Sequence, residues 1–283
     1  MRTNLADYEC LTPGSVREAL EQRATGRKLI PIAGGTDVMV WMNDGHLGKV
    51  GKVYQSLHAL AGEWRYVKTD TEGNLRIGAL ATYSDVRHHE DVKKNYPMLV
   101  HSAQVTGAIQ IQNRGTLAGN IANGSPAADT VPALMVYDAK LRLVNASGER
   151  VVELSEFFTG YRANVLKEEE LISEIILPKP RFAADQQYYR KVGTREAQAI
   201  SKVVFAGAND GKGNVRMAWG SVAPITLRSK KTEDAVAAGA AADDAWAILQ
   251  TEITPIDDIR STRDYRLKVS QRILADFLGK VHQ

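Results

Sequence analysis

The chain has 283 residues, of which 44% are hydrophobic and 24% are charged, and its formal net charge is +3. This length allows two domains, or one large domain with subdomains, and the composition is typical of a soluble globular protein. Because basic and acidic residues alternate, the sequence excludes the basic cluster that binding to nucleic acid or to an anionic membrane would need.

Hydropathy and cysteine content exclude further classes of protein. No run of 18 apolar residues exists, so the sequence predicts no membrane span. Residues 1–7 contain neither an apolar signal core nor a twin-arginine pair, so we expect a cytoplasmic protein, exported only within a complex whose partner carries the signal. The one cysteine, Cys10, excludes an internal disulfide and a cysteine-ligated iron–sulfur or zinc site, and we interpret it as a small packed hydrophobe.

The N-terminal part predicts a compact unit of helix, strand and helix. A capping-box pattern at 15–18 begins a helix that should end near residue 23. The apolar run 29–33 predicts a short buried strand that leads into two glycines. Residues 36–37 are suitable caps for a short helix over 38–42.

The middle of the chain predicts two hairpins, three helices and a buried strand. The segment 113–128 is rich in glycine, asparagine and small residues, so we expect a loop there. The other expected elements are strands 64–68 and 75–77, helices 83–89, 98–105 and 129–137, strands 140–145 and 149–153, and strand 171–177.

A proline-rich boundary separates the C-terminal part. Pro178-Lys179-Pro180 is the best candidate for a domain junction. Beyond it we expect a three-stranded antiparallel sheet followed by helices, which is an α+β arrangement. These elements are strands 188–192, 202–206 and 215–219 and helices 231–238, 244–251 and 262–280.

Common catalytic and nucleotide-binding motifs are absent from the sequence. No G-x-G-x-x-G follows a strand, and the glycine-rich stretch 45–52 lacks the spacing of a phosphate loop. No G-x-S-x-G or H-E-x-x-H motif occurs. Asp85, His88 and His89 share one helix face, but a solvated helix end is the commoner reason for such a cluster, so we expect no metal there.

Two glycine loops, 32–37 and 115–129, are the best candidates for a binding site. Glycines let backbone amides close around an anion, and both loops contain a threonine hydroxyl. They lie about 80 residues apart, each at an expected strand-to-helix junction, and Asp129 is available to accept bonds from ligand hydroxyls. Taken alone, the pair predicts a ligand that carries phosphate.

The loops and their neighbours resemble the FAD-binding subunits of molybdenum hydroxylases, the family of xanthine dehydrogenase and carbon monoxide dehydrogenase. The similarity covers about residues 5–220. It is carried by Ala33–Asp37, Asn113–Asp129, Pro132–Leu134, Ala139–Leu141, Phe157–Tyr161, Glu169–Ile172, Lys191–Arg195 and Ile200–Val203.

The resemblance implies a fold and a cofactor. It implies an FAD-binding domain of the vanillyl-alcohol-oxidase type over 1–178, with subdomains of about 1–56 and 57–178, and a smaller α+β domain over 181–283. FAD would be held noncovalently, since neither loop contains histidine or cysteine. The implied cofactor-binding residues are Ile32, Ala33, Gly34, Gly35, Thr36, Asp37, Val38, Thr106, Thr116, Gly119, Asn120, Ala122, Asn123, Asp129, Ile172 and Lys191.

Individual roles follow from the same resemblance. Asp129 would bond to ribitol or ribose hydroxyls, Ile172 would pack on the flavin, and Lys191 would approach its pyrimidine end and favour the reduced form. Ala118 replaces the first of two glycines that the family usually has. If that position needed positive φ, alanine would cost about 1 kcal/mol, but we expect it to be tolerated because Gly119 is kept.

By the same resemblance, the chain is one subunit of a complex. A large subunit would carry molybdopterin, a small subunit would carry two 2Fe–2S clusters, and FAD would pass electrons to NAD⁺ or another acceptor. Three alternatives remain open: a stand-alone FAD-dependent oxidoreductase, a non-catalytic nucleotide-binding module and a scaffolding protein.

Overall fold

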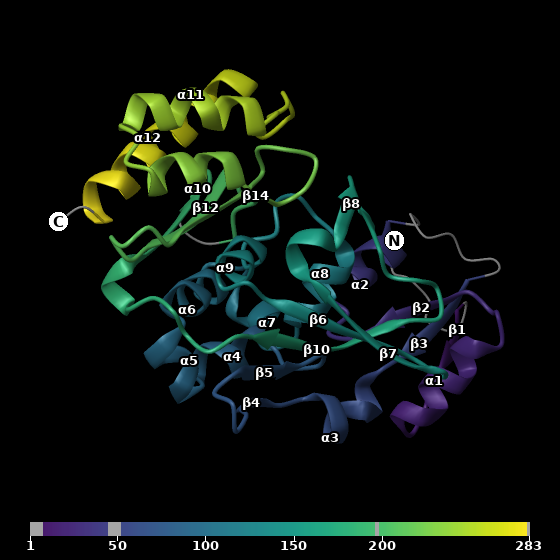
Figure 1. The fold of residues 1–283 in the computed structure, drawn as a ribbon. Coiled ribbons are helices and arrows are strands. Elements are labelled where there is room, and N and C mark those ends of the chain that lie inside the picture. Colours follow the sequence, from purple (N-terminus) through teal and green to yellow (C-terminus); the bar gives the residue numbers. More distant parts are fainter. Residues whose placement is uncertain (1–7, 45–51, 196–197, 282–283) are drawn as a thin grey trace.

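The computed structural model describes residues 8–44, 52–195 and 198–281 (Figure 1). The rejected phosphate-loop stretch 45–52 therefore lies outside the described residues except for Lys52. No helix in these three ranges is long and apolar enough to cross a membrane. No cluster of metal-ligating side chains occurs in them either, and Asp85 instead accepts a hydrogen bond from Arg65 at 2.8 Å.

The N-terminal unit contains a parallel three-stranded sheet in the order β1-β3-β2. The expected helix, strand and helix are present, and the Ser15 side chain caps the first helix by accepting from the Glu18 amide. The sequence missed β1 and β3, and Cys10 is exposed on β1, so its interpretation as a packed hydrophobe was wrong. The elements are β1 (Glu9–Leu11), α1 (Val16–Ala24), β2 (Leu29–Ile32), α2 (Val38–Asn43) and β3 (Val53–Ser56).

An antiparallel five-stranded sheet forms the centre of the molecule, in the order β4-β5-β10-β6-β7. Its central strand, β10, is buried throughout and has the predicted bounds. Apolar residues occupy all of its positions except Ser173 and Glu174, as expected of a strand covered on both faces. The first strand was predicted too early, since Trp64 ends a short helix. The strands are β4 (Val67–Thr69), β5 (Leu75–Gly78), β6 (Lys140–Asn145), β7 (Gly148–Glu153) and β10 (Leu171–Leu177).

Short helices and one small hairpin surround this sheet. Helices α4, α6 and α9 were expected, whereas α5 and α7 were missed. The elements are η2 (His58–Leu60), α3 (Ala61–Trp64), α4 (Tyr83–His88), α5 (Glu90–Asn95), α6 (Pro97–Gln104), α7 (Ile109–Gln112), α8 (Leu117–Asn123), α9 (Val131–Val136), η3 (Leu154–Glu156), β8 (Phe158–Gly160) and β9 (Ala163–Asn164).

Helix α8 corrects the prediction that 113–128 is a loop. Thr116 caps it by accepting from the Gly119 amide at 3.1 Å, and Gly124, with a φ of 63°, ends it in the left-handed conformation. Leu117 and Ile121 are fully buried one helical turn apart. Glycine and asparagine have low helix propensity, so the composition concealed a helix that tertiary packing stabilises. The second glycine segment therefore begins between α7 and α8, continues through α8, and does not follow a strand.

The C-terminal sheet has four antiparallel strands, one more than predicted, because the two-residue strand β14 was missed. Alternate side chains serve opposite faces: Ala206 and Ala218 join the core around α9, whereas Phe205 and Trp219 pack beneath the helices. Figure 1 shows these helices on the outer side of the sheet. The elements are η4 (Ala184–Gln186), β11 (Gln187–Val192), β12 (Val203–Asn209), β13 (Val215–Gly220), β14 (Leu227–Arg228), α10 (Lys230–Ala237), α11 (Ala242–Glu252) and α12 (Arg263–Val281).

Asp138 connects the two parts of the molecule. Its φ of 53° is unusual for a residue other than glycine. Its carboxylate pairs with Arg228 at 2.8 Å, with Arg181 at 3.2 Å and with Arg216 at 3.5 Å, all of which follow the proline boundary in sequence. This acidic hub fixes the C-terminal sheet against the turn after α9.

Candidate functional site

The two glycine segments touch each other. A β-carbon placed on Gly34 would lie only 1.9 Å from the carbonyl oxygen of Arg114 and 3.0 Å from the Cα of Gly115. Such a contact is possible only for glycine, so the sequence at this point is dictated by the approach of two backbones. The neighbouring Gly35 has a φ of 76°, which also favours glycine.

Unused backbone donors accompany this contact. Within the part of the chain that the structure describes, no hydrogen bond uses the amides of Gly34, Gly35 or Thr36. A side-chain bond of 3.2 Å from Asn123 to Asp37 then joins α8 to the start of α2. Free amides on a glycine-bearing turn are suited to bind an anionic group.

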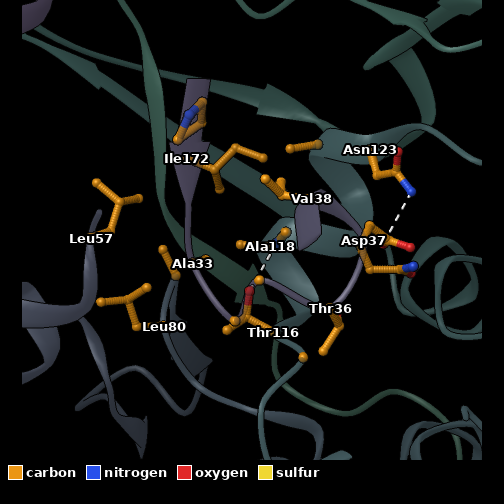
Figure 2. Close-up of a pocket in the computed structure, with 18 of the residues that line it drawn as sticks. Ala33, Thr36, Asp37, Val38, Leu57, Leu80, Thr116, Ala118, Asn123 and Ile172 are labelled. Atoms are coloured by element: carbon orange, nitrogen blue, oxygen red, sulfur yellow. Dashed lines mark hydrogen bonds between the residues drawn. The ribbon is translucent and has the colours of Figure 1, made fainter. Parts of the chain in front are cut away.

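A cavity of about 540 Å³ opens at this junction. Figure 2 shows Leu57, Leu80 and Ala33 on one side of it and Asp37 and Asn123 on the opposite side. The cavity can therefore hold a ligand with an apolar part and a polar part. The predicted residues that line it are Ala33, Gly34, Gly35, Thr36, Asp37, Val38, Thr106, Thr116, Gly119, Asn120, Ala122, Asn123 and Ile172.

Ile32 is the predicted residue of the first loop that lines neither cavity. It ends β2 and packs, partly buried, against the small core of Tyr8, Met42 and Tyr54. Ala118 lies inside α8, lines the first cavity, and is not among the residues with positive φ. Its replacement of a family glycine therefore causes no backbone strain.

Sequence reasoning missed several lining residues. Leu57 and Leu80 lie outside regular strands, and neither shows a sequence signal for a binding site. Trp41 and Arg162 line the cavity as well. Arg162 directly follows the segment Phe157–Tyr161, which is one of the segments that carry the family resemblance.

A second cavity of about 870 Å³ adjoins the first. It reaches the C-terminal part, where Ser201, Ser221 and Arg266 contribute to its wall, and Asp129 lines it as well. The residues common to both cavities are Asp37, Trp41, Thr106, Ile111, Asn120, Asn123 and Arg162. One elongated ligand can therefore occupy both cavities.

Asp129 is held in a buried ion pair behind the second cavity. Lys191 donates to its Oδ2 at 2.7 Å and to the carbonyl of Val105 at 2.8 Å, and Ser201 donates to its Oδ1 at 2.5 Å. The side chains of Lys191 and Asp129 are only 7% and 10% exposed. Burial raises the pKa of the Asp129 carboxyl, while Lys191 and Ser201 oppose that rise.

Lys191 itself lines neither cavity. Two of its three ammonium donors are used by Val105 and Asp129, which fix the position of the ammonium group behind the second cavity. Beyond it, Arg266 donates to the carbonyls of Lys202 and Ser221 at 2.6 and 2.8 Å. These bonds tie the wall of the second cavity to the last helix.

Two family models match the chain. Residues 6–180 match the FAD binding domain in molybdopterin dehydrogenase, and residues 187–281 match the CO dehydrogenase flavoprotein C-terminal domain.

Individual proteins show the same similarity. The nicotinate dehydrogenase FAD-subunit of Eubacterium barkeri is 30% identical over 204 residues, which are 70% of this chain and 67% of that protein. The glyceraldehyde dehydrogenase medium chain of Sulfolobus acidocaldarius is 29% identical over 271 residues, 93% of this chain and 94% of that one. A chain of the solved carbon monoxide dehydrogenase from Hydrogenophaga pseudoflava superposes with a TM-score of 0.88 at 25% identity, covering 97% of this chain and 96% of that chain.

Proposed function

Because the chain belongs to the family of FAD-binding medium subunits of xanthine dehydrogenase and carbon monoxide dehydrogenase type oxidoreductases, we propose that its two adjoining cavities together hold one FAD molecule. The observation that carries this proposal is the contact of Gly34 with Arg114 and Gly115. It brings both glycine segments to one cavity and leaves backbone amides free there. A diphosphate needs such donors.

The remaining residues fit the other parts of the cofactor. Leu57, Leu80 and Ile172 offer an apolar surface for a flat ring system. Thr36 and Thr116 flank the unused amides, and Asp129 is available to ligand hydroxyls in the second cavity. The other predicted residues that line the cavities keep their proposed contacts with the cofactor, whereas Ile32 lines neither cavity and supports the first loop by packing on the core beneath it.

Lys191 is the proposed tuning residue. FAD, when bound, supplies the redox chemistry of the subunit. The Lys191 ammonium, held by Asp129 in a largely dry site, places positive charge near the second cavity and favours a ligand that gains negative charge. Asp129 partly neutralises that charge, so the effect depends on the geometry of the pair.

We further propose that electrons reach the chain from a partner with 2Fe–2S clusters, after oxidation of the substrate on a molybdopterin subunit, and leave to NAD⁺ or another acceptor. The proposal is supported by the single cysteine, which leaves this chain without ligands for a cysteine-bound cluster. The family matches at 6–180 and 187–281 support the proposed domains 1–178 and 181–283. The cytoplasmic location stays a prediction, which cell fractionation checks.

Denaturation tests the cofactor. We expect heat or acid to release intact FAD from the purified protein. Release of FMN, or flavin that stays on the denatured chain, would contradict the proposal.

Copurification tests the complex. Expressed with its genomic neighbours, the chain should purify with molybdenum, iron and FAD together. If the chain alone oxidised an organic substrate, or if no metal-bearing partner copurified, the stand-alone oxidoreductase would replace this proposal.

A further inference from the structure

Arg162 stands at the tip of the hairpin between β8 and β9 and lines both cavities. Its φ of 52° lies in the left-handed region, which residues other than glycine seldom adopt. Its Cα lies 3.4 Å from the point where a β-carbon of Gly124 would be, so the hairpin tip rests on the end of α8. Backbone strain of this kind often accompanies a functional role.

The Arg162 guanidinium lies over aromatic rings and has no hydrogen-bonded partner among the described residues. Its central carbon is 5.7 Å from the ring centroid of Trp41 and 5.7 Å from that of Tyr161. The positive charge of Arg162 acts on the Asp37 carboxyl. Burial raises the Asp37 pKa and Arg162 lowers it, although the two groups form no ion pair. Five N–H donors therefore remain available beside the wall that both cavities share.

We propose that Arg162 binds the diphosphate of the dinucleotide that spans the two cavities. This inference rests on the proposed function, since it requires FAD in that position. FAD has a ring system at each end and a diphosphate between them. A molecule that fills both cavities must pass its diphosphate along the shared wall, where Arg162 lies together with Asp37, the last residue of the first glycine loop. The planar guanidinium matches two phosphate oxygens at once, which a lysine cannot do.

The experiment compares ligands with and without phosphate, using Arg162→Asn in the full chain freed of flavin. Asparagine tolerates the left-handed conformation, so the substitution removes the charge and leaves the backbone unstrained. We expect the Kd for FAD to rise at least about tenfold, the Kd for riboflavin to stay unchanged, and the dependence of FAD binding on ionic strength to become shallower. Arg272→Asn, on the exposed surface of α12 and lining neither cavity, is the matched control and should bind FAD like the wild type.

Arg162→Lys separates charge from shape and should give an intermediate Kd. Circular dichroism checks that each variant is folded. Unchanged FAD affinity in Arg162→Asn, or weaker FAD binding with an unchanged ionic-strength dependence, would overturn the assignment to the diphosphate. Failure of the wild-type chain to bind FAD would instead overturn the proposed function, so the two failures are distinguishable.

Discussion

The wall of the first cavity forms where two stretches of backbone touch. The second cavity instead depends on Asp129, whose carboxylate accepts hydrogen bonds from Lys191 and Ser201 of the C-terminal part. In the first, glycine at position 34 has no substitute, because a carbonyl oxygen occupies the space of a side chain. In the second, Lys191, Ser201 and Asp129 are mutually dependent through hydrogen bonds. Steric limits therefore govern one half of the site, and electrostatic balance governs the other.

Gly34→Ala is the strongest test of the steric half. Its β-carbon would lie 1.9 Å from the Arg114 carbonyl, so one of the two loops must move. We expect loss of FAD retention and more than about 4 kcal/mol of stability, measured by flavin content and by urea unfolding. The matched control is Gly62→Ala in the exposed helix α3, where a β-carbon meets nothing within 4 Å. It should stabilise the protein by about 0.5–1 kcal/mol, and equal losses in both variants would contradict the steric explanation.

Lys191→Met tests the electrostatic half. It leaves the Asp129 carboxylate buried without its cation, so we expect a loss of about 3 kcal/mol and a more negative flavin reduction potential. The double variant Asp129→Asn with Lys191→Met should recover part of the loss. An additive loss in the double variant would show that the two groups act independently.

The stability of the Lys191→Met variant should also depend on pH. A carboxyl whose pKa is raised in the folded protein makes stability fall as the pH rises from its unfolded pKa to its folded pKa. Lys191 lowers the Asp129 pKa, so its replacement by methionine raises that pKa further in the folded protein. The pH range over which stability falls therefore becomes wider. Denaturant titrations over a pH series should show the stability deficit of Lys191→Met growing toward higher pH, and a deficit independent of pH would count against this assignment.

The sequence revealed the elements and residues whose signals are local. Strand β10, which is largely apolar and is followed by Pro178-Lys179-Pro180, was predicted with its observed bounds, and the glycine loops were recognisable by composition. The strands β1 and β3 were not predicted, because neither has the apolar run that identified β2: Glu9 lies in β1, and Gln55 and Ser56 lie in β3. The Lys191–Asp129 pair joins residues 62 positions apart, and no local pattern reports such a contact.

Asp138→Asn tests the contact between the C-terminal sheet and the turn after α9. Asparagine keeps the left-handed backbone but replaces the charge that three arginines share. We expect a loss of about 1–2 kcal/mol and faster amide exchange in β13 and β14, with the first cavity unaffected. An exposed pair serves as control: Arg17→Ala, which breaks the bond to Glu21, should leave the midpoint of urea unfolding unchanged.

Thr116→Val is the smallest change and tests whether the first cavity needs the hydrogen bond of the Thr116 hydroxyl. The Thr116 hydroxyl caps α8 by accepting from the Gly119 amide, and valine keeps the shape while removing that acceptor. We expect a loss of about 1 kcal/mol, the usual effect of removing a helix cap, together with weaker FAD binding because Asn120 and Asn123 lie on the same short helix. Thr116→Ser keeps the oxygen and should behave like the wild type in thermal unfolding and flavin titration. If Thr116→Val retained both stability and FAD affinity, the Thr116 hydroxyl would contribute nothing to the first cavity, and the packing of Leu117 and Ile121 would be sufficient to position the start of α8.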